Sequence, residues 1–301
     1  MNTDVSARPV ALVTGVGREI GIGAAIARRL ARDGFDLVIT YWSAYDDRMP
    51  WGVMPRDIDT IAASLRASGA RVSTVAADLT LVSAAEEIFD HAEREVGPVS
   101  ALVLSHAESV DSGLLDTSVE SFDRHFAVNT RASWLLLREF GVRRARAAER
   151  LGVPMPVPVP VPVPGPLPVP VASPLPLPLA SALPLPLPLA SALPPGRIVA
   201  LTSDHTVGNL PYGASKGALD RIVIAAAREL AHLAVTSNVV NPGPTDTGWM
   251  TAELRAEVLA QTPAGRAGTP ADAAALVSFL CSAEGGWVNG QLLYSNGGFP
   301  A

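Results

Sequence analysis

Short apolar runs alternate with helical patterns along most of this chain, and that alternation limits the possible folds more than any other feature. Runs rich in Val, Ile and Leu occur at Val10–Thr14, Leu37–Tyr41, Arg71–Ala76, Ala101–Leu104, Arg197–Thr202, Val235–Asn241 and Gln291–Ser295. The helical patterns between them cover Gly23–Arg32, Ile58–Ala67, Ala84–Val96, Ser118–Arg150, Tyr212–Leu233 and Ala271–Cys281. Because strands joined through helices pair in parallel, the order predicts an α/β fold, with a doubly wound, seven-stranded parallel sheet covered by helices on both faces.

One segment does not fit this alternation. Between Pro154 and Pro195, proline occupies almost every second position, and the ten residues PLPLPLASAL occur twice in succession, from Pro174 and from Pro184. Proline has no amide hydrogen and a fixed φ, so this segment cannot join a helix or a central strand. We expect residues 154–195 to be a disordered, low-complexity insert in a single domain formed by residues 1–153 and 196–301. It connects a helix to the following strand, so it should lie at the edge of the sheet opposite the ligand-binding edge.

Charge and composition exclude several functions. The formal net charge is −6, which argues against a nucleic-acid or membrane surface, and we interpret the basic group Arg143, Arg144 and Arg146 as a solvated helix face. The one cysteine, Cys281, lies on an expected buried helix face and cannot form a disulfide within the chain, and residues 1–9 lack the apolar core of a signal peptide. The five histidines are scattered, so we expect no metal site. The single cysteine and the missing signal peptide together predict a cytoplasmic protein.

A glycine-rich turn follows the first predicted strand and opens the first helix. It reads Thr14-Gly15-Val16-Gly17-Arg18-Glu19-Ile20-Gly21-Ile22-Gly23. Glycines let the backbone approach a pyrophosphate, and a helix N-terminus offers free amides and a partial positive charge. The turn therefore predicts a dinucleotide-binding site at the start of the domain.

Further motifs follow in a consistent order. They are Ala77-Asp78-Leu79 after the third strand, Val128-Asn129-Thr130 in the long helix, Ser203 after the fifth strand, Tyr212-Gly213-Ala214-Ser215-Lys216, and Asn241-Pro242-Gly243-Pro244-Thr245. Together they resemble the short-chain dehydrogenase/reductase family in its single-domain Rossmann form, and within it the 3-oxoacyl-[acyl-carrier-protein] reductases. The resemblance covers nearly all of the chain except the insert.

Three departures from the family pattern stand out. The glycine turn is two residues longer than usual, and Tyr212 follows Ser203 by only nine positions. Leu104-Ser105-His106-Ala107 stands where the family has Asn-Asn-Ala-Gly. We interpret His106 as a packed or surface histidine rather than a catalyst.

The resemblance implies a set of functional residues. The catalytic residues would be Ser203, Tyr212, Lys216 and Asn129. The cofactor-binding residues would be Gly15, Gly17, Arg18, Gly21, Ile22, Tyr41, Asp78, Leu79, Tyr212, Lys216, Pro242, Gly243 and Thr245.

The chemistry of the Tyr-Lys pair can be argued from the residues themselves. Tyr212 and Lys216 are four apart and share one face of a helix. A phenol has an unperturbed pKa near 10, and a neighbouring ammonium should lower it, so that Tyr212 acts as general acid or base. We therefore expect an NAD(P)-dependent oxidoreductase that moves a hydride between nicotinamide and a carbonyl or secondary alcohol.

The finer specificity stays open at this point. No acidic residue directly follows the second strand, and Arg18 or Arg48 is available for a 2′-phosphate, so we favour NADP over NAD. The aromatic segment Tyr41–Val53 either forms a lid around the adenine or packs on the surface. The substrate is a small molecule bordered by residues 203–212 and by the loop Thr245–Gln261, where Trp249 and Met250 suggest an apolar wall.

Two alternatives to an oxidoreductase remain open. The chain could be a non-catalytic dinucleotide-binding regulator, or a scaffold that acts through the proline-rich insert. The resemblance implies a homo-tetramer or a homo-dimer.

Overall fold

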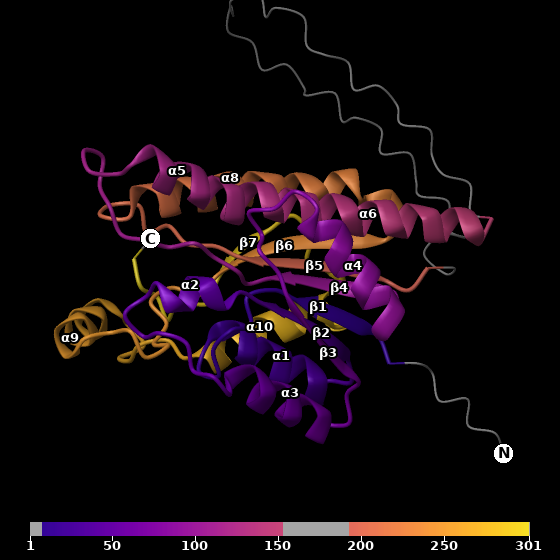
Figure 1. Ribbon diagram of the computed structural model, residues 1–301, viewed down its shortest axis with the longest axis horizontal. Coiled ribbons are helices and arrows are strands. Elements are labelled where there is room, and N and C mark those ends of the chain that lie inside the picture. The colour runs from indigo at the N-terminus through magenta and orange to yellow at the C-terminus, as the bar shows by residue number, and fades with distance from the viewer. Residues whose placement is uncertain (1–7, 153–192, 301) are drawn as a thin grey trace, which may run out of the picture.

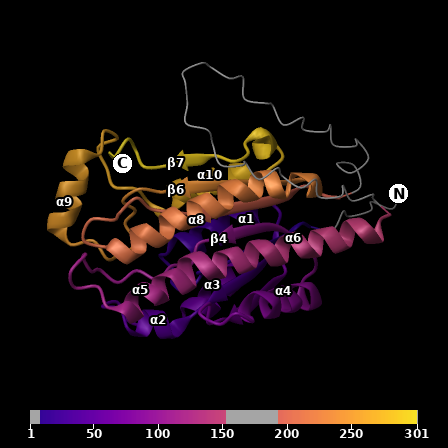
Figure 2. The same ribbon diagram turned by 90° about the horizontal axis from the view of Figure 1, so that it is seen from above.

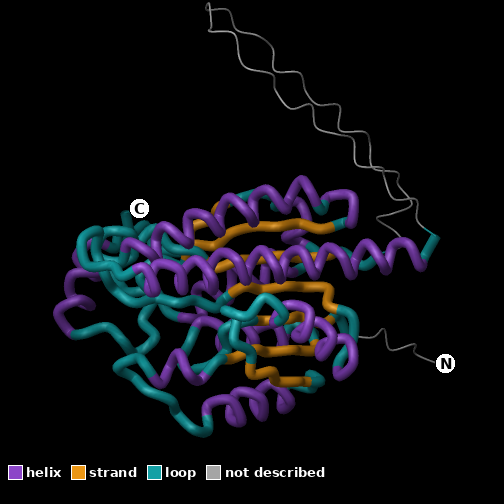
Figure 3. Tube along the Cα trace, turned by 45° about the horizontal axis from the view of Figure 1, so that its top comes forward, coloured by secondary structure: helices purple, strands orange, loops and turns teal. Residues whose placement is uncertain are grey.

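The computed structural model describes residues 8–152 and 193–300. In the order β3-β2-β1-β4-β5-β6-β7, its seven strands form one parallel sheet, which Figure 3 shows between the helices. They are β1 (Val10–Val13), β2 (Asp36–Tyr41), β3 (Val72–Ala76), β4 (Val99–Leu104), β5 (Gly196–Leu201), β6 (Val235–Asn241) and β7 (Leu292–Tyr294). The predicted doubly wound sheet is confirmed, and each predicted strand is found within two residues of its expected bounds.

Two helical layers cover the sheet (Figure 1). On one face lie α4 (Ala84–Glu95), α5 (Val119–His125), α6 (Ser133–Arg150) and α8 (Leu210–Glu229), and Figure 2 shows α6 and α8 running side by side. The opposite face carries α1 (Ile22–Arg32), α3 (Asp57–Ala67) and α10 (Pro270–Cys281). Short 3-10 turns are found at η2 (Ala231–Leu233) and η3 (Glu284–Trp287).

Alternate residues of each central strand enter the two cores. In β1, Val10 and Leu12 pack under α4, α6 and α8, whereas Ala11 and Val13 pack against α1 and α10. All four are almost fully buried, as expected for a parallel strand covered on both faces. Burial of this kind contributes about 25 cal/mol for each Å² of apolar surface, so this apolar composition holds the central strands inside the sheet.

Besides the short 3-10 turns, three elements were not predicted from the sequence. The segment after β2 contains a short helix, α2 (Ser43–Asp47), and the expected loop Thr245–Gln261 contains α9 (Ala252–Gln261). The long predicted helix over residues 118–150 is α5 and α6 joined by a π-helical turn, η1 (Phe126–Ala132). Hydrophobic periodicity does not distinguish one wide turn from the α-helix around it, so the sequence shows no sign of η1.

The strand order reverses between β1 and β4, because β2 and β3 lie to one side of β1 and the later strands lie to the other. In sheets of this kind, ligands bind outside the carboxyl ends of the strands at the reversal point. The segment 154–195, predicted to be a disordered insert, lies outside the described residues except for residues 193–195. Its two flanks, the end of α6 and the start of β5, are at the amino edge of the sheet.

The interpretation of the basic group on α6 was wrong in part. Arg144 is buried, and its guanidinium donates to the Leu233 carbonyl (2.9 and 3.1 Å) and to the Pro194 carbonyl (2.7 Å). Arg143 forms ion pairs with Asp90, Glu93 and Glu139. Periodicity placed these side chains on a polar face, but neighbouring elements cover that face. Cys281 is buried on α10 as expected, and burial raises the pKa of its thiol to about 12.

The structure also bears on membrane insertion and metal binding. Among the described residues, no helix combines the length and hydropathy that crossing a bilayer requires. Within residues 8–152 and 193–300, no group of three or more His, Cys, Asp or Glu side chains is arranged to hold a metal ion.

Candidate active site

Ser203, Tyr212 and Lys216 come together at the carboxyl edge of the sheet. Ser203 follows β5, and Tyr212 lies in the first turn of α8, directly after Pro211, which is compatible with a helix start because its missing amide has no partner there anyway. Lys216 follows one turn later, and its Nζ lies 5.7 Å from the centre of the Tyr212 ring. The side chain of Ser203 hydrogen-bonds the Tyr212 hydroxyl. The four-residue spacing therefore places the side chains of Tyr212 and Lys216 on the same face of α8, as the sequence predicts.

The acidity of Tyr212 differs from the expectation. Burial raises the pKa of Tyr212 to about 12, and only the hydrogen bond with Ser203 acts in the opposite direction. The ammonium of Lys216 is directed at main-chain carbonyls rather than at the phenol oxygen, so it does not acidify Tyr212 in this structure. A phenol with such a pKa keeps its proton at neutral pH, which suits a proton donor.

Lys216 is itself a buried cation. Its Nζ donates to the Leu201 carbonyl at 2.9 Å and to the His106 carbonyl at 3.4 Å. Burial lowers the pKa of Lys216 to about 8, while the nearby carboxylate of Asp220 raises it. Lys216 thus joins the carboxyl ends of β4 and β5 from beneath the phenol.

Asn129 lies within the π-helical turn and is fully buried. Its side chain accepts from the Glu108 amide (2.8 Å), donates to the Glu108 carbonyl (2.9 Å) and donates to Ser215 Oγ (2.9 Å). Ser215 Oγ in turn donates to the Tyr212 carbonyl at 2.8 Å. The extra residue of the wide turn allows one amide to hold both the segment after β4 and the first turn of α8.

His106 stands at the main departure from the family pattern, and the structure packs it in the interior. Nδ1 lies 2.7 Å from Thr14 Oγ1, and Nε2 lies 3.1 Å from the Val128 carbonyl. Because a carbonyl can only accept, Nε2 carries the proton and Nδ1 accepts from Thr14. Burial, and secondarily Lys216, lower the pKa of His106 to about 3. His106 therefore links β1, β4 and η1 as a neutral packed residue.

This buried histidine predicts a loss of stability in acid. The unfolded chain binds a proton at His106 below about pH 6.5 and the folded chain does not, so stability falls as pH drops through the window from about 6.5 to about 3. From this residue alone we expect a loss of about 2 kcal/mol between about pH 7.5 and about pH 5. The measurement is urea unfolding of the wild type and of His106→Asn, which keeps an acceptor for Thr14. An equally steep fall in the variant would contradict the assignment.

The glycine-rich turn is packed tightly against the end of β4. Gly15 has φ +73°, and a Cβ there would lie 2.6 Å from the His106 backbone. A Cβ at Gly23 would lie 2.6 Å from the Gly15 carbonyl oxygen. Helix α1 begins at Ile22, with Gly21 as its N-cap, without a side-chain cap and without an acidic residue in its first turn. Its first amides are therefore free of competing carboxylates, as a phosphate-binding turn requires.

Residues of the turn between Gly17 and Gly21 reach the loop after β6. The Arg18 guanidinium donates to the Thr247 carbonyl at 2.9 Å. A Cβ at Gly248 would meet Ile20 Cδ1 at 2.6 Å, so the two loops are in close contact.

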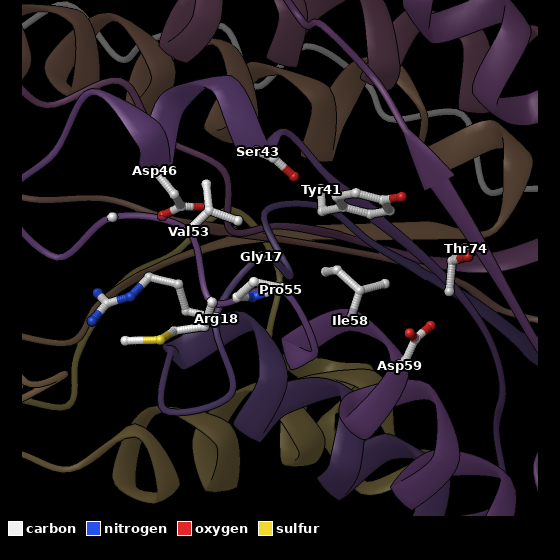
Figure 4. A pocket seen from close by; sticks show the side chains of 12 residues that line it. Gly17, Arg18, Tyr41, Ser43, Asp46, Val53, Pro55, Ile58, Asp59 and Thr74 are labelled. Atoms are coloured by element: carbon white, nitrogen blue, oxygen red, sulfur yellow. The ribbon is translucent and has the colours of Figure 1, made fainter.

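A cavity of about 260 Å³ opens beside Gly17 (Figure 4). Its lining includes Arg18, Tyr41 at the end of β2, Ser43 and Asp46. Arg48, the other candidate for a 2′-phosphate, does not line this cavity and pairs with Glu108 instead. In the aromatic segment after β2, Trp42 is exposed, whereas Trp51 Nε1 donates to Asp46 Oδ1 at 2.9 Å.

Asp78 lies beside a second cavity, of about 210 Å³, at the end of β3. Trp42, Ala76, Ala77 and Asp78 line it. Asp78 Oδ1 accepts from the amide and the hydroxyl of Thr80, which fixes the turn, and Leu79 is buried in the core. Asp78 thus lies at the carboxyl end of β3, on the border of this cavity.

The Pro-Gly loop after β6 abuts the C-terminal segment. Gly243 has φ +61°, and a Cβ at that position would clash with Asn296. Thr245 Oγ1 bonds the carbonyls of Pro242 and Gly243 at 3.3 and 3.2 Å. These contacts hold the loop against the edge of the sheet near Ser203.

Sequence reasoning missed several residues around this site. Glu108 is a buried carboxylate, and the Tyr45 hydroxyl donates to the Ser109 carbonyl at 3.3 Å. Asp46 is buried next to Gly17, and burial raises the pKa of its carboxyl. No motif marks these residues, and the only signal was the aromatic richness of the segment in which Tyr45 and Asp46 lie.

Comparison with known proteins agrees with this geometry. A family model described as Enoyl-(Acyl carrier protein) reductase matches residues 15–150 and 183–300. An uncharacterized oxidoreductase of Bacillus subtilis, YjdA, is 32% identical over 98% of each chain. The NADPH-dependent aldehyde reductase-like protein of Arabidopsis thaliana chloroplasts is 32% identical over 96% of this chain and 93% of its own. A blue fluorescent protein from a metagenomic library, solved in complex with NADPH, is 27% identical with a TM-score of 0.72, over 98% of this chain and 99% of its own.

Proposed function

The chain belongs to the short-chain dehydrogenase/reductase family, and on that premise we propose that it reduces an aldehyde or ketone with a hydride from NADPH. The observation that carries the proposal is the convergence of Ser203, Tyr212 and Lys216 at the carboxyl edge of the sheet. Similarity to an NADPH-dependent aldehyde reductase-like protein supports the reaction class, and similarity to a structure in complex with NADPH supports the cofactor. The same chemistry run backwards oxidises an alcohol.

The residues present fit a dinucleotide. The uncapped N-terminus of α1 and the close-packed glycines Gly15 and Gly17 leave backbone amides for a pyrophosphate. The cavity beside Gly17 offers Arg18, Ser43 and Tyr41 to the adenosine ribose and its phosphate. Asp78 and Leu79 border the adenine, and Lys216 with the Pro242–Thr245 loop borders the nicotinamide end.

The catalytic roles follow from these positions. When bound, nicotinamide supplies the hydride. Ser203 donates a hydrogen bond to the carbonyl oxygen of the substrate, and Tyr212, whose raised pKa keeps its proton in place, donates that proton to the same oxygen. Lys216 holds the ribose. Asn129 joins the first turn of α8 to the segment after β4 through its hydrogen bonds to Ser215 and Glu108.

The panel that tests this function combines purified protein, aldehydes and ketones of several sizes, and NADPH or NADH. Consumption of the reduced cofactor with at least one carbonyl supports the proposal. Failure to bind either nicotinamide would overturn it. Neither the regulator nor the scaffold alternative gains support from the comparisons, because similar proteins of known activity are oxidoreductases.

Arg18 is proposed as the residue that selects NADPH. A guanidinium paired with a phosphate contributes about 1.5–3 kcal/mol, so Arg18→Ala should raise the KM for NADPH by about 10- to 100-fold and change the KM for NADH little. Arg29→Ala, in the last turn of α1 and away from the glycine-rich turn, serves as the control. Equal losses with both cofactors would show that Arg18 supports the turn rather than a 2′-phosphate.

Three expectations, on domain organisation, location and assembly, remain proposals. Residues 154–195 form an insert within the single catalytic domain. The protein works in the cytoplasm. It assembles as a homo-tetramer or homo-dimer, for which sedimentation of the full chain is the test.

A further inference from the structure

The segment after β2 crosses the carboxyl edge of the sheet. Residues 43–51, here called the strap, comprise α2 and the turn that ends at Trp51. Figure 1 shows α2 at the edge of the sheet that also carries α9. The strap starts beside β3 and β2 and contacts loops that follow both β1 and β4.

On the β4 side, the strap is fastened by an ion pair. Arg48 Nη1 and Nη2 donate to the two carboxylate oxygens of Glu108 at 3.1 and 3.0 Å. The side chain of Glu108 is almost fully buried, so this pair is the partner that compensates its charge. Tyr45 adds the hydrogen bond to the Ser109 carbonyl, and Asn129 fixes the Glu108 backbone from below.

On the β1 side, the strap rests on the glycine-rich turn. Asp46 lies so close to Gly17 that a Cβ there would be 2.9 Å from Asp46 Oδ2. Trp51 hydrogen-bonds the other oxygen of Asp46, and the Arg18 guanidinium lies 4.6 Å from the centre of the Trp51 ring. The strap is therefore attached at both ends of the crevice.

These two attachments lie on the two sides of the strand reversal. A dinucleotide in this fold class binds across the carboxyl ends of β1 and β4, with its pyrophosphate at the glycine-rich turn. A strap that joins Gly17 to Glu108 must pass over that position. The cofactor then cannot enter or leave along this edge unless one attachment opens.

We infer that the strap is a gate on cofactor exchange and that the Arg48–Glu108 pair is its latch. This inference rests on the proposed use of NADPH. The latch is the attachment suited to open, because Arg48 is 40% exposed and can exchange its partner for water. The attachment at Gly17 is held by close packing and by the buried carboxyl of Asp46.

A gate predicts a specific kinetic pattern. Since the strap must open for both entry and release, Arg48→Gln should raise the association and dissociation rate constants for NADPH together, each by about 10- to 100-fold. The dissociation constant should change less than either rate. Glu108→Gln should act in the same direction, and the double variant should add little to the faster single variant, because both changes break one interaction.

Stopped-flow fluorescence with NADPH as the probe measures both rates without any substrate. The matched control is Arg29→Gln, because Arg29 also places two hydrogen bonds on one carboxylate, Asp33, and its side chain is 41% exposed. Circular dichroism checks that each variant is folded. Hydrogen exchange in the free protein adds a second readout, since amides of residues 43–51 should exchange faster in Arg48→Gln than in Arg29→Gln.

The outcomes are separable. If dissociation alone accelerates and the dissociation constant rises in proportion, the pair only contributes binding energy and the gate is wrong. If all rates match those of Arg29→Gln, the gate is also wrong, while NADPH binding leaves the proposed function standing. If the wild type binds no nicotinamide at all, both proposals fall.

Discussion

Tyr212→Phe is expected to lose about 10²- to 10⁴-fold in kcat for carbonyl reduction while its dissociation constant for NADPH stays within about two-fold of the wild type. The phenylalanine keeps the ring and removes the proton donor. Burial has raised the pKa of this phenol to about 12, so the wild type carries the proton throughout the neutral range. Steady-state kinetics and fluorescence titration with NADPH measure the two quantities separately.

Ser203→Ala provides the comparison for this variant. It removes the hydrogen bond that lowers the pKa of Tyr212 but leaves the phenol in place, so its loss in kcat should be the smaller of the two. A Tyr212→Phe protein that turns over at the wild-type rate would remove Tyr212 from the chemistry. A variant that no longer binds NADPH would assign the residue to cofactor binding instead.

Lys216→Met should lose both turnover and cofactor affinity. The methionine fills a similar volume but donates no hydrogen bond to the Leu201 and His106 carbonyls or to the ribose. We expect kcat/KM to fall by about 10³-fold or more and NADPH to bind at least about 10-fold more weakly. The contrast with Tyr212→Phe, which keeps its affinity, separates the two roles.

The pH dependence of cofactor binding gives a further check on Lys216. Its pKa is lowered to about 8 by burial, so the ammonium is present below that pH and is lost above it. The wild type should therefore bind NADPH more weakly as pH rises from about 7 to about 9, and Lys216→Met should not follow this trend. A variant with the same pH dependence as the wild type would place the titrating group elsewhere.

The sequence was sufficient for the features that have a period or a fixed spacing. The strands are continuous apolar runs because both faces of the sheet are covered, and Tyr212 and Lys216 share a helix face because they are four residues apart. Both statements depend on local geometry that a single sequence carries. The long helix was predicted for the same reason, although its central turn is wider than an α-helical turn.

The rest depends on contacts between residues far apart in the chain. Arg48 and Glu108 are 60 positions apart, and no pattern in either segment indicates their ion pair. His106 appeared only as a deviation from a motif, and its role as a neutral link became clear only with Thr14 and Val128 beside it. The raised pKa of Tyr212 was also unpredictable, because the sequence gives the spacing of the ammonium but not its direction or the extent of burial.

The most direct test of the central claim follows the hydride itself. The wild type is given NADPH in which both hydrogens on the reactive carbon of the nicotinamide are replaced by deuterium, together with a carbonyl that the panel has identified as a substrate, and the product is examined by mass spectrometry and NMR. Our account predicts one deuterium on the carbon that bore the carbonyl oxygen, and a proton from solvent on the oxygen. A product without deuterium on that carbon, formed while NADPH is consumed, would contradict it.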